Sequence, residues 1–336
     1  MRIAVVSIMF KTTPPSGYGG IERVVYYLVE ALIKGGHEVI LFATPGSYCS
    51  NQTVEVPGYD PAIAPSGGKK ADTVSEEPLY KAMCAYLQKH PVDIIHDWSF
   101  KNLYVKRHPD KFPFLISTCI PPPPGCKRRK NLVASSRAHA NLCGGSTKYV
   151  YYGLKLSDYQ FNIRKKDHFI HISKIAQYKG QHLAILAAVK ARKRLSIAGN
   201  VEDKMYYYFV IKPFATCFPG VEYLGEINGT NQHLMEATAL IQTPRWFDAF
   251  PLVILESFAS ATPVIAFAEG GIPEQIVNGL NGYLCRSIGE LASAMANILA
   301  IRPETCREYA EEYFRSERMA QDYVALYERI LDGESW

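Results

Sequence analysis

Short apolar runs alternate with helical patterns of apolar residues along most of the chain. In the first half, this pattern predicts strands at 2–9, 37–43, 93–97, 113–119, 131–135 and 148–152. Residues 20–34 carry apolar side chains at Ile21, Val24, Val25, Leu28, Val29 and Leu32, a spacing that lays one stripe of a helix against a sheet. Short apolar strands that alternate with helices are typical of parallel α/β sheets.

The pattern lapses in the polar segment 154–167 and then starts again. The second half predicts strands at 168–173, 194–198, 221–224, 239–243, 263–267 and 282–285, with helices between them and a last helix at 303–331. We therefore predict an α/β protein of two Rossmann-like, doubly wound parallel-sheet domains, residues 1–160 and 161–314. Domains of this kind bind a ligand in the cleft that faces the carboxyl ends of their strands.

Composition restricts the class of protein. The 336 residues are 48% hydrophobic and 21% charged, which is typical of soluble globular proteins. No uninterrupted apolar run is long enough to span a membrane, and we interpret residues 1–10 as a first strand rather than a signal peptide. The eight cysteines form no C-x-x-C pair, so we expect reduced thiols and a cytoplasmic protein.

The net charge of +5 is concentrated in three basic runs, at 126–131, 164–166 and 190–194. These runs are typical of solvated loops and helix ends; the alternative is attraction to an anionic substrate or a membrane surface. They lack interleaved aromatic residues, so we expect no nucleic-acid partner. At most, the charge predicts peripheral contact with the cytoplasmic face of a membrane.

The stretch "SGYGGIERVVYYLVEAL" at 16–32 resembles a phosphate-binding loop that feeds a helix. Gly17 and Gly19 fit the first two places of G-x-G-x-x-G, but Glu22 fills the third, and the second strand ends in "LFATPG" without a carboxylate. A dinucleotide site is therefore not favoured. The Gly19-Gly20 turn still offers an anion the free amides of a helix N-terminus. Glu22 either complements the helix dipole or contacts a ligand.

Two lysines lie in the loop "HISKIAQYKGQH" at 171–182, between a strand and a helix. Lys174 and Lys179 are both cationic near the positive end of a helix dipole, which is unfavourable unless an anion lies between them. A diphosphate would resolve the conflict. The alternative is that both lysines are solvated.

Two carboxylates flank the start of a predicted helix at 252–261. Asp248 precedes the helix and Glu256 lies one turn into it, with seven residues between them. The loop and helix start at 249–252 would supply backbone amides for phosphate. Carboxylates suit sugar hydroxyls because charged acceptors make the stronger hydrogen bonds. The alternative is simple helix capping.

These motifs resemble those of the retaining glycosyltransferases of family 4, which have the two-Rossmann GT-B fold. "PPSGYGGIERVVYYLVEALIKGGHEVILFA" is similar to the family's first glycine loop and helix, "SKIAQYKG" to its G-R-x-x-x-x-K-G loop, and "DAFPLVILE" to its E-x7-E motif. Three positions depart from the family: Asp248 replaces a glutamate, Ser173-Lys174 replaces Gly-Arg, and Thr118-Cys119 stands where a histidine is common. The resemblance extends over nearly the whole chain.

The resemblance implies transfer of a hexose or deoxyhexose from a UDP-, GDP- or ADP-sugar to a hydroxyl of a glycan, lipid or small-molecule acceptor. Asp248, Lys174 and Lys179 would be catalytic. Donor-binding residues would be Gly19, Gly20, Ser173, Glu226, Ala249, Phe250, Pro251, Leu252 and Glu256. Acceptor-binding residues would be Glu22, His96 and Cys119. No cofactor or metal is expected, and the chain contains no D-x-D motif.

Other functions stay open. One alternative is a nucleotide-sugar epimerase or hydrolase on the same fold, and another is a protein that binds a nucleotide-sugar or glycan without catalysis. The segment 307–331 is similar to the terminal helix that crosses back onto the first domain in this fold; the alternative is a helix that packs only on its own domain. The sugar, the base and the acceptor are not encoded in any motif that we identify.

Overall fold

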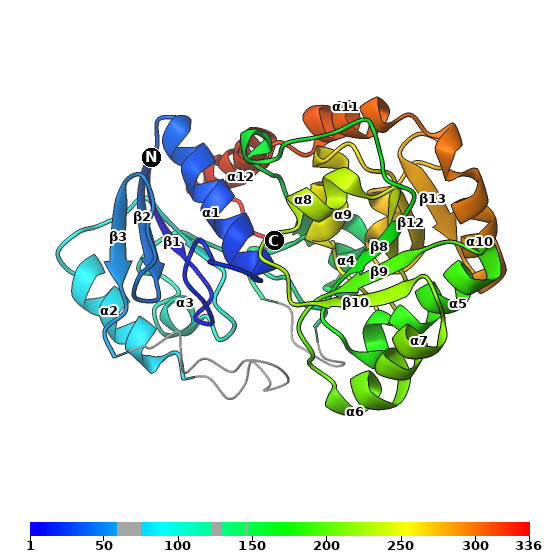
Figure 1. Ribbon diagram of the computed structural model, residues 1–336. Helices are drawn as coiled ribbons and strands as arrows, with labels where there is room; N and C mark the ends of the chain where they lie inside the picture. The colour runs from blue at the N-terminus through cyan, green and yellow to red at the C-terminus, as the bar shows by residue number, and fades with distance from the viewer. Residues whose placement is uncertain (59–74, 123–128, 145–146) are drawn as a thin grey trace. The chain divides into compact units, whose positions relative to one another are not determined.

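The computed structural model describes residues 1–58, 75–122, 129–144 and 147–336. These residues form two compact units, each built on a parallel sheet (Figure 1). The first unit comprises Met1–Leu154 together with Ser316–Trp336, and the second comprises Lys155–Arg315. The chain therefore enters the second unit once and returns to the first for its last helix.

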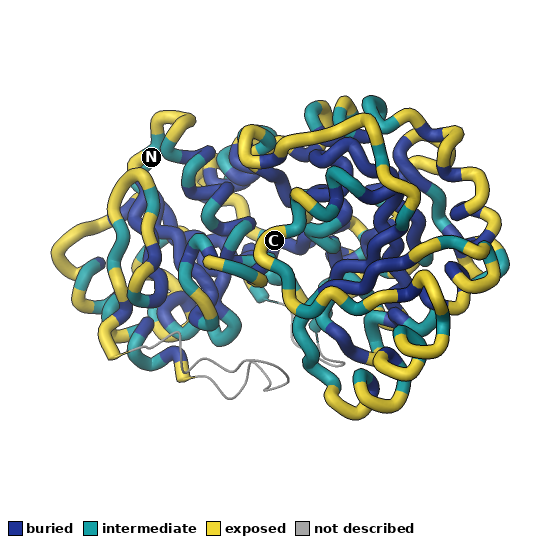
Figure 2. Tube along the Cα trace, in the orientation of Figure 1, coloured by how far each residue is buried: buried dark blue, intermediate teal, exposed yellow. Residues whose placement is uncertain are grey.

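In the described part of the first unit, seven parallel strands form one sheet in the order β3-β2-β1-β4-β5-β6-β7. The strands are β1 (Arg2–Val6), β2 (Glu38–Ala43), β3 (Gln52–Glu55), β4 (Ile94–Asp97), β5 (Phe114–Ser117), β6 (Leu132–Ala134) and β7 (Lys148–Tyr149). Its helices are α1 (Gly20–Lys34), α2 (Glu77–Leu87), α3 (Leu103–Arg107), α4 (Arg137–Leu142) and α12 (Ser316–Leu331). The central strands are buried on both faces, as helices on both faces of a parallel sheet require (Figure 2).

In the second unit, six parallel strands lie in the order β10-β9-β8-β11-β12-β13. They are β8 (Phe169–Ile172), β9 (Leu195–Ala198), β10 (Val221–Gly225), β11 (Ala239–Gln242), β12 (Val264–Phe267) and β13 (Gly282–Cys285). Its α-helices are α5 (Gln181–Ala191), α6 (Lys204–Tyr206), α7 (Lys212–Cys217), α8 (Asn231–Glu236), α9 (Leu252–Ala259), α10 (Ile288–Asn297) and α11 (Pro303–Tyr313). The predicted α/β class with two parallel sheets is confirmed.

The periodicity placed most elements correctly, but it missed the short helices α3 and α4 and was wrong at further places. Strand β3 was not predicted, because its residues are polar and half exposed at the sheet edge. The helix expected between the strands at 263–267 and 282–285 is only a 3₁₀ turn, Ile272–Glu274. The single helix predicted at 303–331 is two helices, α11 and α12. The chain leaves the helical conformation at Phe314, whose side chain is buried.

In the part of the chain that the structure describes, no helix has both the length and the apolar character needed to span a membrane.

A buried polar network attaches α12 to the first sheet. His96 on β4 is fully buried; its Nδ1 lies 2.6 Å from the Tyr327 hydroxyl and its Nε2 2.8 Å from the Ser117 hydroxyl. The Ser117 hydroxyl also lies 2.9 Å from the hydroxyl of Tyr323. Burial lowers the pKa of His96 to about 3, so the imidazole is neutral.

This network contradicts the acceptor-binding role predicted for His96. Both ring nitrogens are engaged inside the protein, and no part of the side chain reaches solvent. The residue was predicted as functional because it lies near a strand end, but its side chain faces the terminal helix rather than a ligand.

Removing one hydroxyl from this network should lower the free energy of unfolding. Tyr327→Phe leaves a buried imidazole nitrogen without its partner, and we expect it to lower the free energy of unfolding by about 1–3 kcal/mol. Tyr149→Phe, at a side chain that is 41% exposed, is the matched control and should change little. Urea denaturation of both variants measures the difference; equal midpoints would contradict the structural role of the network.

Candidate functional site

The loop after β8 holds both predicted lysines in a defined geometry. Buried Gln181 donates hydrogen bonds from Nε2 to the Ser173 hydroxyl (2.8 Å) and to the Lys174 carbonyl (2.7 Å). A 3₁₀ turn, Gln177–Lys179, then leads into Gly180 and α5. Ser173 therefore serves to fix the loop from which both lysine side chains project.

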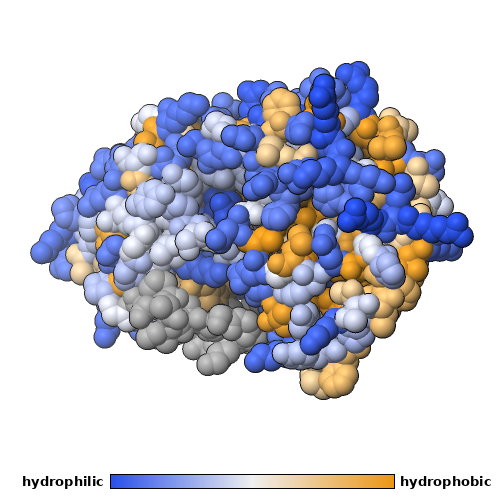
Figure 3. Space-filling model, viewed as in Figure 1, coloured by the Kyte–Doolittle hydropathy of each residue, from blue (hydrophilic) through white to orange (hydrophobic). Residues whose placement is uncertain are grey.

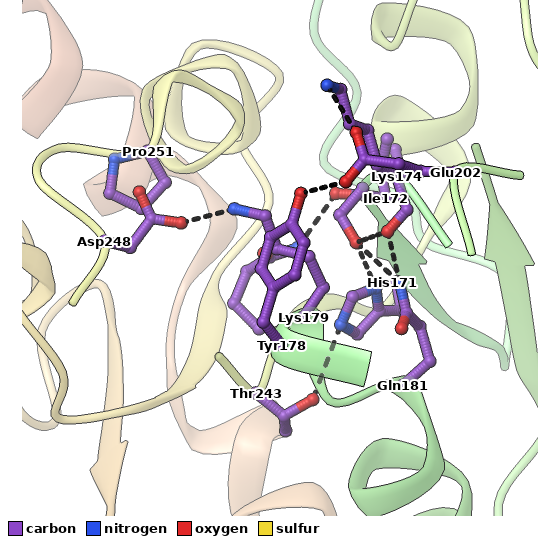
Figure 4. A network of polar contacts seen from close by, with 12 residues as sticks. His171, Ile172, Lys174, Tyr178, Lys179, Gln181, Glu202, Thr243, Asp248 and Pro251 are labelled. Carbon is purple, nitrogen blue, oxygen red and sulfur yellow. Dashed lines mark hydrogen bonds and ion pairs between the residues drawn. The ribbon is translucent and has the colours of Figure 1, made fainter. Parts of the chain in front are cut away.

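Lys179 forms an ion pair with the first predicted carboxylate. Its Nζ lies 2.6 Å from Asp248 Oδ2, and the two side chains are 17% and 14% exposed (Figure 4). The ammonium also lies 5.7 Å from the ring centroid of Tyr178 and 5.2 Å from that of Trp246. Cation–π attraction to two rings adds to the ion pair in holding the ammonium in place.

Lys174 has a partner that sequence reasoning missed. Its Nζ lies 2.8 Å from Glu202 Oε2, while the Tyr178 hydroxyl donates to Glu202 Oε1 at 2.7 Å (Figure 4). Burial acts to raise the pKa of Glu202, but the hydrogen bonds from Lys174 and Tyr178 and the charges of Lys174 and Lys179 outweigh it. The pKa of Glu202 is therefore held below its ordinary value, and the carboxylate stays ionised.

One chain of contacts thus joins both lysines within the second unit. It runs from Asp248 through Lys179 and the Tyr178 ring to Glu202 and Lys174. We call these five residues the lysine cluster. The conflict between two ammonium groups, which predicted a diphosphate, is resolved in this structure by two carboxylates. A bound diphosphate would therefore exchange with these counterions rather than fill an uncompensated positive site.

The turn after Asp248 is shaped by backbone contacts. The Gly271 amide donates to the Asp248 carbonyl at 2.8 Å, and Gln275 Nε2 donates to the Pro251 carbonyl at 3.1 Å. Ala249 and Phe250 are buried, so their side chains belong to the core and only their backbone can serve a ligand. The amide of Leu252 belongs to the first turn of α9, where no partner exists within the helix.

Glu256, the second carboxylate of the motif, is buried. It is 6% exposed; Oε1 accepts from the Tyr159 hydroxyl at 3.1 Å and Oε2 from the Thr230 hydroxyl at 2.9 Å. A ribose would have to share these oxygens with Tyr159 and Thr230. The ribose-binding role of Glu256 stays a prediction. Glu226 is exposed just beyond β10, and its donor-binding role also stays a prediction.

In the first unit, Glu22 and Cys119 are two of the predicted acceptor residues. Glu22 is 4% exposed in the first turn of α1, and its Oε2 lies 3.1 Å from where a Cβ on Gly19 would be. Burial, with a further contribution from the charge of Glu22, raises the pKa of the half-buried Cys119 to about 12, so the thiol is neutral.

Gly19 caps α1, and Gly20 is its first residue, where a Cβ would meet no atom within 4 Å. The phosphate-binding role of both glycines stays a prediction.

Two protein-family models match this chain. Residues 157–314 match the model of the glycosyl transferases group 1, and residues 18–117 match that of glycosyltransferase family 4. The two matches together extend over most of both units. The chain belongs to the family 4 glycosyltransferases.

Individual relatives are more distant. N-acetyl-alpha-D-glucosaminyl L-malate synthase of Bacillus anthracis is 33% identical over 93 residues, which span 25% of this chain and 24% of that protein. The match thus covers about a quarter of this curated relative's length.

Solved structures of similar fold extend over the whole chain. A glycosyltransferase involved in avilamycin A biosynthesis has a TM-score of 0.79 at 23% identity, with 100% of this chain and 99% of that chain covered. The Anabaena protein HepE, solved with UDP and glucose, has a TM-score of 0.70 at 17% identity, covering 96% and 98%. These likenesses confirm the GT-B fold of this family 4 chain.

Two departures from the family's motifs have a structural consequence. The lysine in the arginine place contacts Glu202 through one ammonium, whereas an arginine would offer a planar, two-point grip. Asp248, one methylene shorter than glutamate, still reaches Lys179. Both substituted positions therefore carry smaller side chains, and each still forms an ion pair with a side chain of opposite charge.

Close backbone packing against Gly270 positions the loop that carries Asp248. Gly270 has φ +59°, and a Cβ there would lie 2.1 Å from the Asp248 carbonyl oxygen. Gly270→Ala combines left-handed strain with this clash, and we expect a loss of about 1–3 kcal/mol or more in the free energy of unfolding. Gly279→Ala is the control, because Gly279 has φ +80° but no atom within 4 Å. Thermal unfolding should show the larger loss for Gly270→Ala; the reverse order would contradict this packing.

Proposed function

We propose that this family 4 glycosyltransferase transfers a hexose or deoxyhexose from a nucleotide-sugar to a hydroxyl of a glycan, lipid or small-molecule acceptor, with retention of anomeric configuration and without a metal ion. UDP- and GDP-sugars are the first candidates for the donor, and an ADP-sugar is the third. The observation that carries the proposal is the Lys179–Asp248 ion pair next to the amide-bearing turn at 249–252. There, a cation for phosphate and a carboxylate for sugar hydroxyls lie side by side.

The lysine cluster suits the charge changes of the reaction. When the bond between the sugar C1 and the diphosphate oxygen breaks, negative charge develops on the leaving diphosphate. Lys174 and Lys179 stabilise that charge where it forms, which is electrostatic catalysis. As Lys179 turns to phosphate, Asp248 is released to accept a sugar hydroxyl, so donor binding converts one ion pair into two ligand contacts.

Retention follows from attack on the leaving-group side. The acceptor oxygen forms the new bond to C1 on the face that the diphosphate leaves, and a diphosphate oxygen takes the hydroxyl proton. In this mechanism Asp248, which donor binding releases from its 2.6 Å ion pair with Lys179, accepts a sugar hydroxyl and does not act as a nucleophile.

Two further observations support the details of the proposal. UDP is bound in one structural relative, the Anabaena protein HepE, which favours a UDP-sugar for the first assay. The sequence has no D-x-D motif, and among the described residues no three His, Cys, Asp or Glu side chains are grouped so as to hold a metal ion.

The proposal is tested by incubating the chain with UDP-, GDP- and ADP-sugars in the presence of a panel of hydroxyl acceptors. Proton NMR of the product should show the anomeric configuration of the donor. Epimerised sugar or free sugar without acceptor would instead identify an epimerase or hydrolase. Saturable binding of the nucleoside diphosphate without turnover on any acceptor would identify a non-catalytic binding protein.

Lys179 should have a large effect on turnover. Lys179→Ala removes a cation from the developing diphosphate charge, and we expect kcat to fall roughly a hundredfold or more. Lys166→Ala is the matched control, since Lys166 forms an ion pair of the same length, 2.6 Å with Glu236, on the exposed surface of the same unit. Steady-state kinetics compares the two; similar rates would remove Lys179 from the catalytic machinery.

Metal independence gives a separate prediction. Turnover should be unchanged in excess EDTA and should not rise when Mg²⁺ or Mn²⁺ is added back, because the lysines supply the positive charge that a divalent ion would otherwise provide. The rate with and without chelator measures this. Loss of activity in EDTA that is restored by metal would contradict the metal-free mechanism while leaving the transferase assignment intact.

A further inference from the structure

The helical segment at 204–217 presents apolar side chains to solvent. α6, the π-helical segment Tyr207–Ile211 and α7 follow one another without a break. Their outward-facing residues are Met205, Tyr208, Phe209, Lys212, Pro213 and Thr216, all of them exposed. We call this set the outer stripe. Met205, Tyr208 and Phe209 are 67%, 57% and 71% exposed.

The outer face of this segment differs from that of an ordinary surface helix. A helix that covers a sheet normally turns polar residues outward and apolar ones inward. Here Tyr206 and Ile211 do face inward and are buried, yet the outer face is also apolar and aromatic. Hydrophobic residues are visible at the surface over α6 and α7 (Figure 3). A contiguous exposed patch, unlike a single exposed side chain, indicates an interaction surface.

The charges within the segment 204–221 are of one sign. No Asp or Glu occurs from Lys204 to Val221, whereas Lys204 and Lys212 both lie within this stretch and are exposed. Lys212 Nζ lies 5.8 Å from the ring centroid of Tyr208, so cation and aromatic ring share one face. Arg194, the last residue of the basic run at 190–194, packs beside Gly220 at the end of this segment.

We propose that the outer stripe is a docking surface for an anionic lipid bilayer. Aromatic and aliphatic side chains with lysines on the same face are the chemistry by which a helix lies in a membrane interface: the apolar groups enter the headgroup boundary and the lysines pair with anionic lipids. A second copy of this chain fits less well. In a two-fold pair the same patch meets itself, so Lys204 and Lys212 of one copy would be brought close to the same lysines of the other.

The surface belongs to the second unit alone, and none of its residues is part of the lysine cluster. The lysines of this segment have no role in the proposed transferase mechanism. Docking on a membrane would bring the enzyme to a lipid-linked acceptor. The inference does not depend on the proposed catalytic roles, because vesicle binding can be measured without any donor.

The test is flotation of the full chain with vesicles. Wild type should float with vesicles of phosphatidylcholine mixed with phosphatidylglycerol and not with phosphatidylcholine alone. Lys204→Gln and Lys212→Gln should each weaken partitioning about fivefold. Met205→Ser/Phe209→Ser should abolish it. Leu299→Ser, which removes an 80% exposed apolar side chain elsewhere in the unit, and Arg302→Gln, which removes an exposed cation, are controls that should float like wild type.

Each outcome decides the proposal. Because the substituted side chains are exposed, thermal unfolding should be unchanged and nucleoside diphosphate binding should persist in every variant. Absence of binding to anionic vesicles, or equal binding by the stripe variants and the Leu299→Ser control, overturns the proposal. A wild-type dimer in light scattering that Met205→Ser/Phe209→Ser converts to a monomer, without vesicle binding, would identify a second copy as the occupant instead.

Discussion

The Lys179–Asp248 ion pair is the constraint on which the proposed site depends, and close backbone packing holds both of its members. Gly180 follows Lys179 with φ +71°, and a Cβ there would lie 2.0 Å from the Thr243 carbonyl oxygen. Gly270 approaches the Asp248 backbone equally closely. Because neither position has room for a side chain, the loop after β8 and the loop before α9 are held against their neighbours. The pair joins two segments far apart in sequence, and it fixes where a cation and a carboxylate can meet a ligand.

The lysine cluster changes how donor binding should be understood. Each ammonium has a carboxylate partner, Asp248 for Lys179 and Glu202 for Lys174, so the cluster is balanced in charge. Leaving an ion uncompensated in a half-buried site is costly, whereas exchanging one anion for another avoids most of that cost. A diphosphate that replaces the carboxylates therefore meets preformed cations. Tyr178 links the two pairs, because its ring contacts Lys179 and its hydroxyl holds Glu202.

Much of this arrangement could be predicted from the sequence. Both parallel sheets, the lysine loop and the Asp248 turn follow from local periodicity and from glycines and charges next to strand ends. Glu202 could not be predicted in the same way, because its partner Lys174 is 28 residues away and meets it only through the β8–β9 pairing. One signal was available, namely a carboxylate soon after the adjacent strand. His96 was misassigned for a related reason: its partner, Tyr327, lies 231 residues away on the terminal helix.

Calorimetric titration of the full chain with UDP, GDP, ADP and TDP tests the central claim most directly, since it measures the exchange of carboxylate for diphosphate before any acceptor is known. The account predicts one-to-one binding of at least one of these nucleotides, weakened by salt and lost on Lys179→Met. No heat from any nucleoside diphosphate, or an affinity that Lys179→Met leaves unchanged, would contradict it.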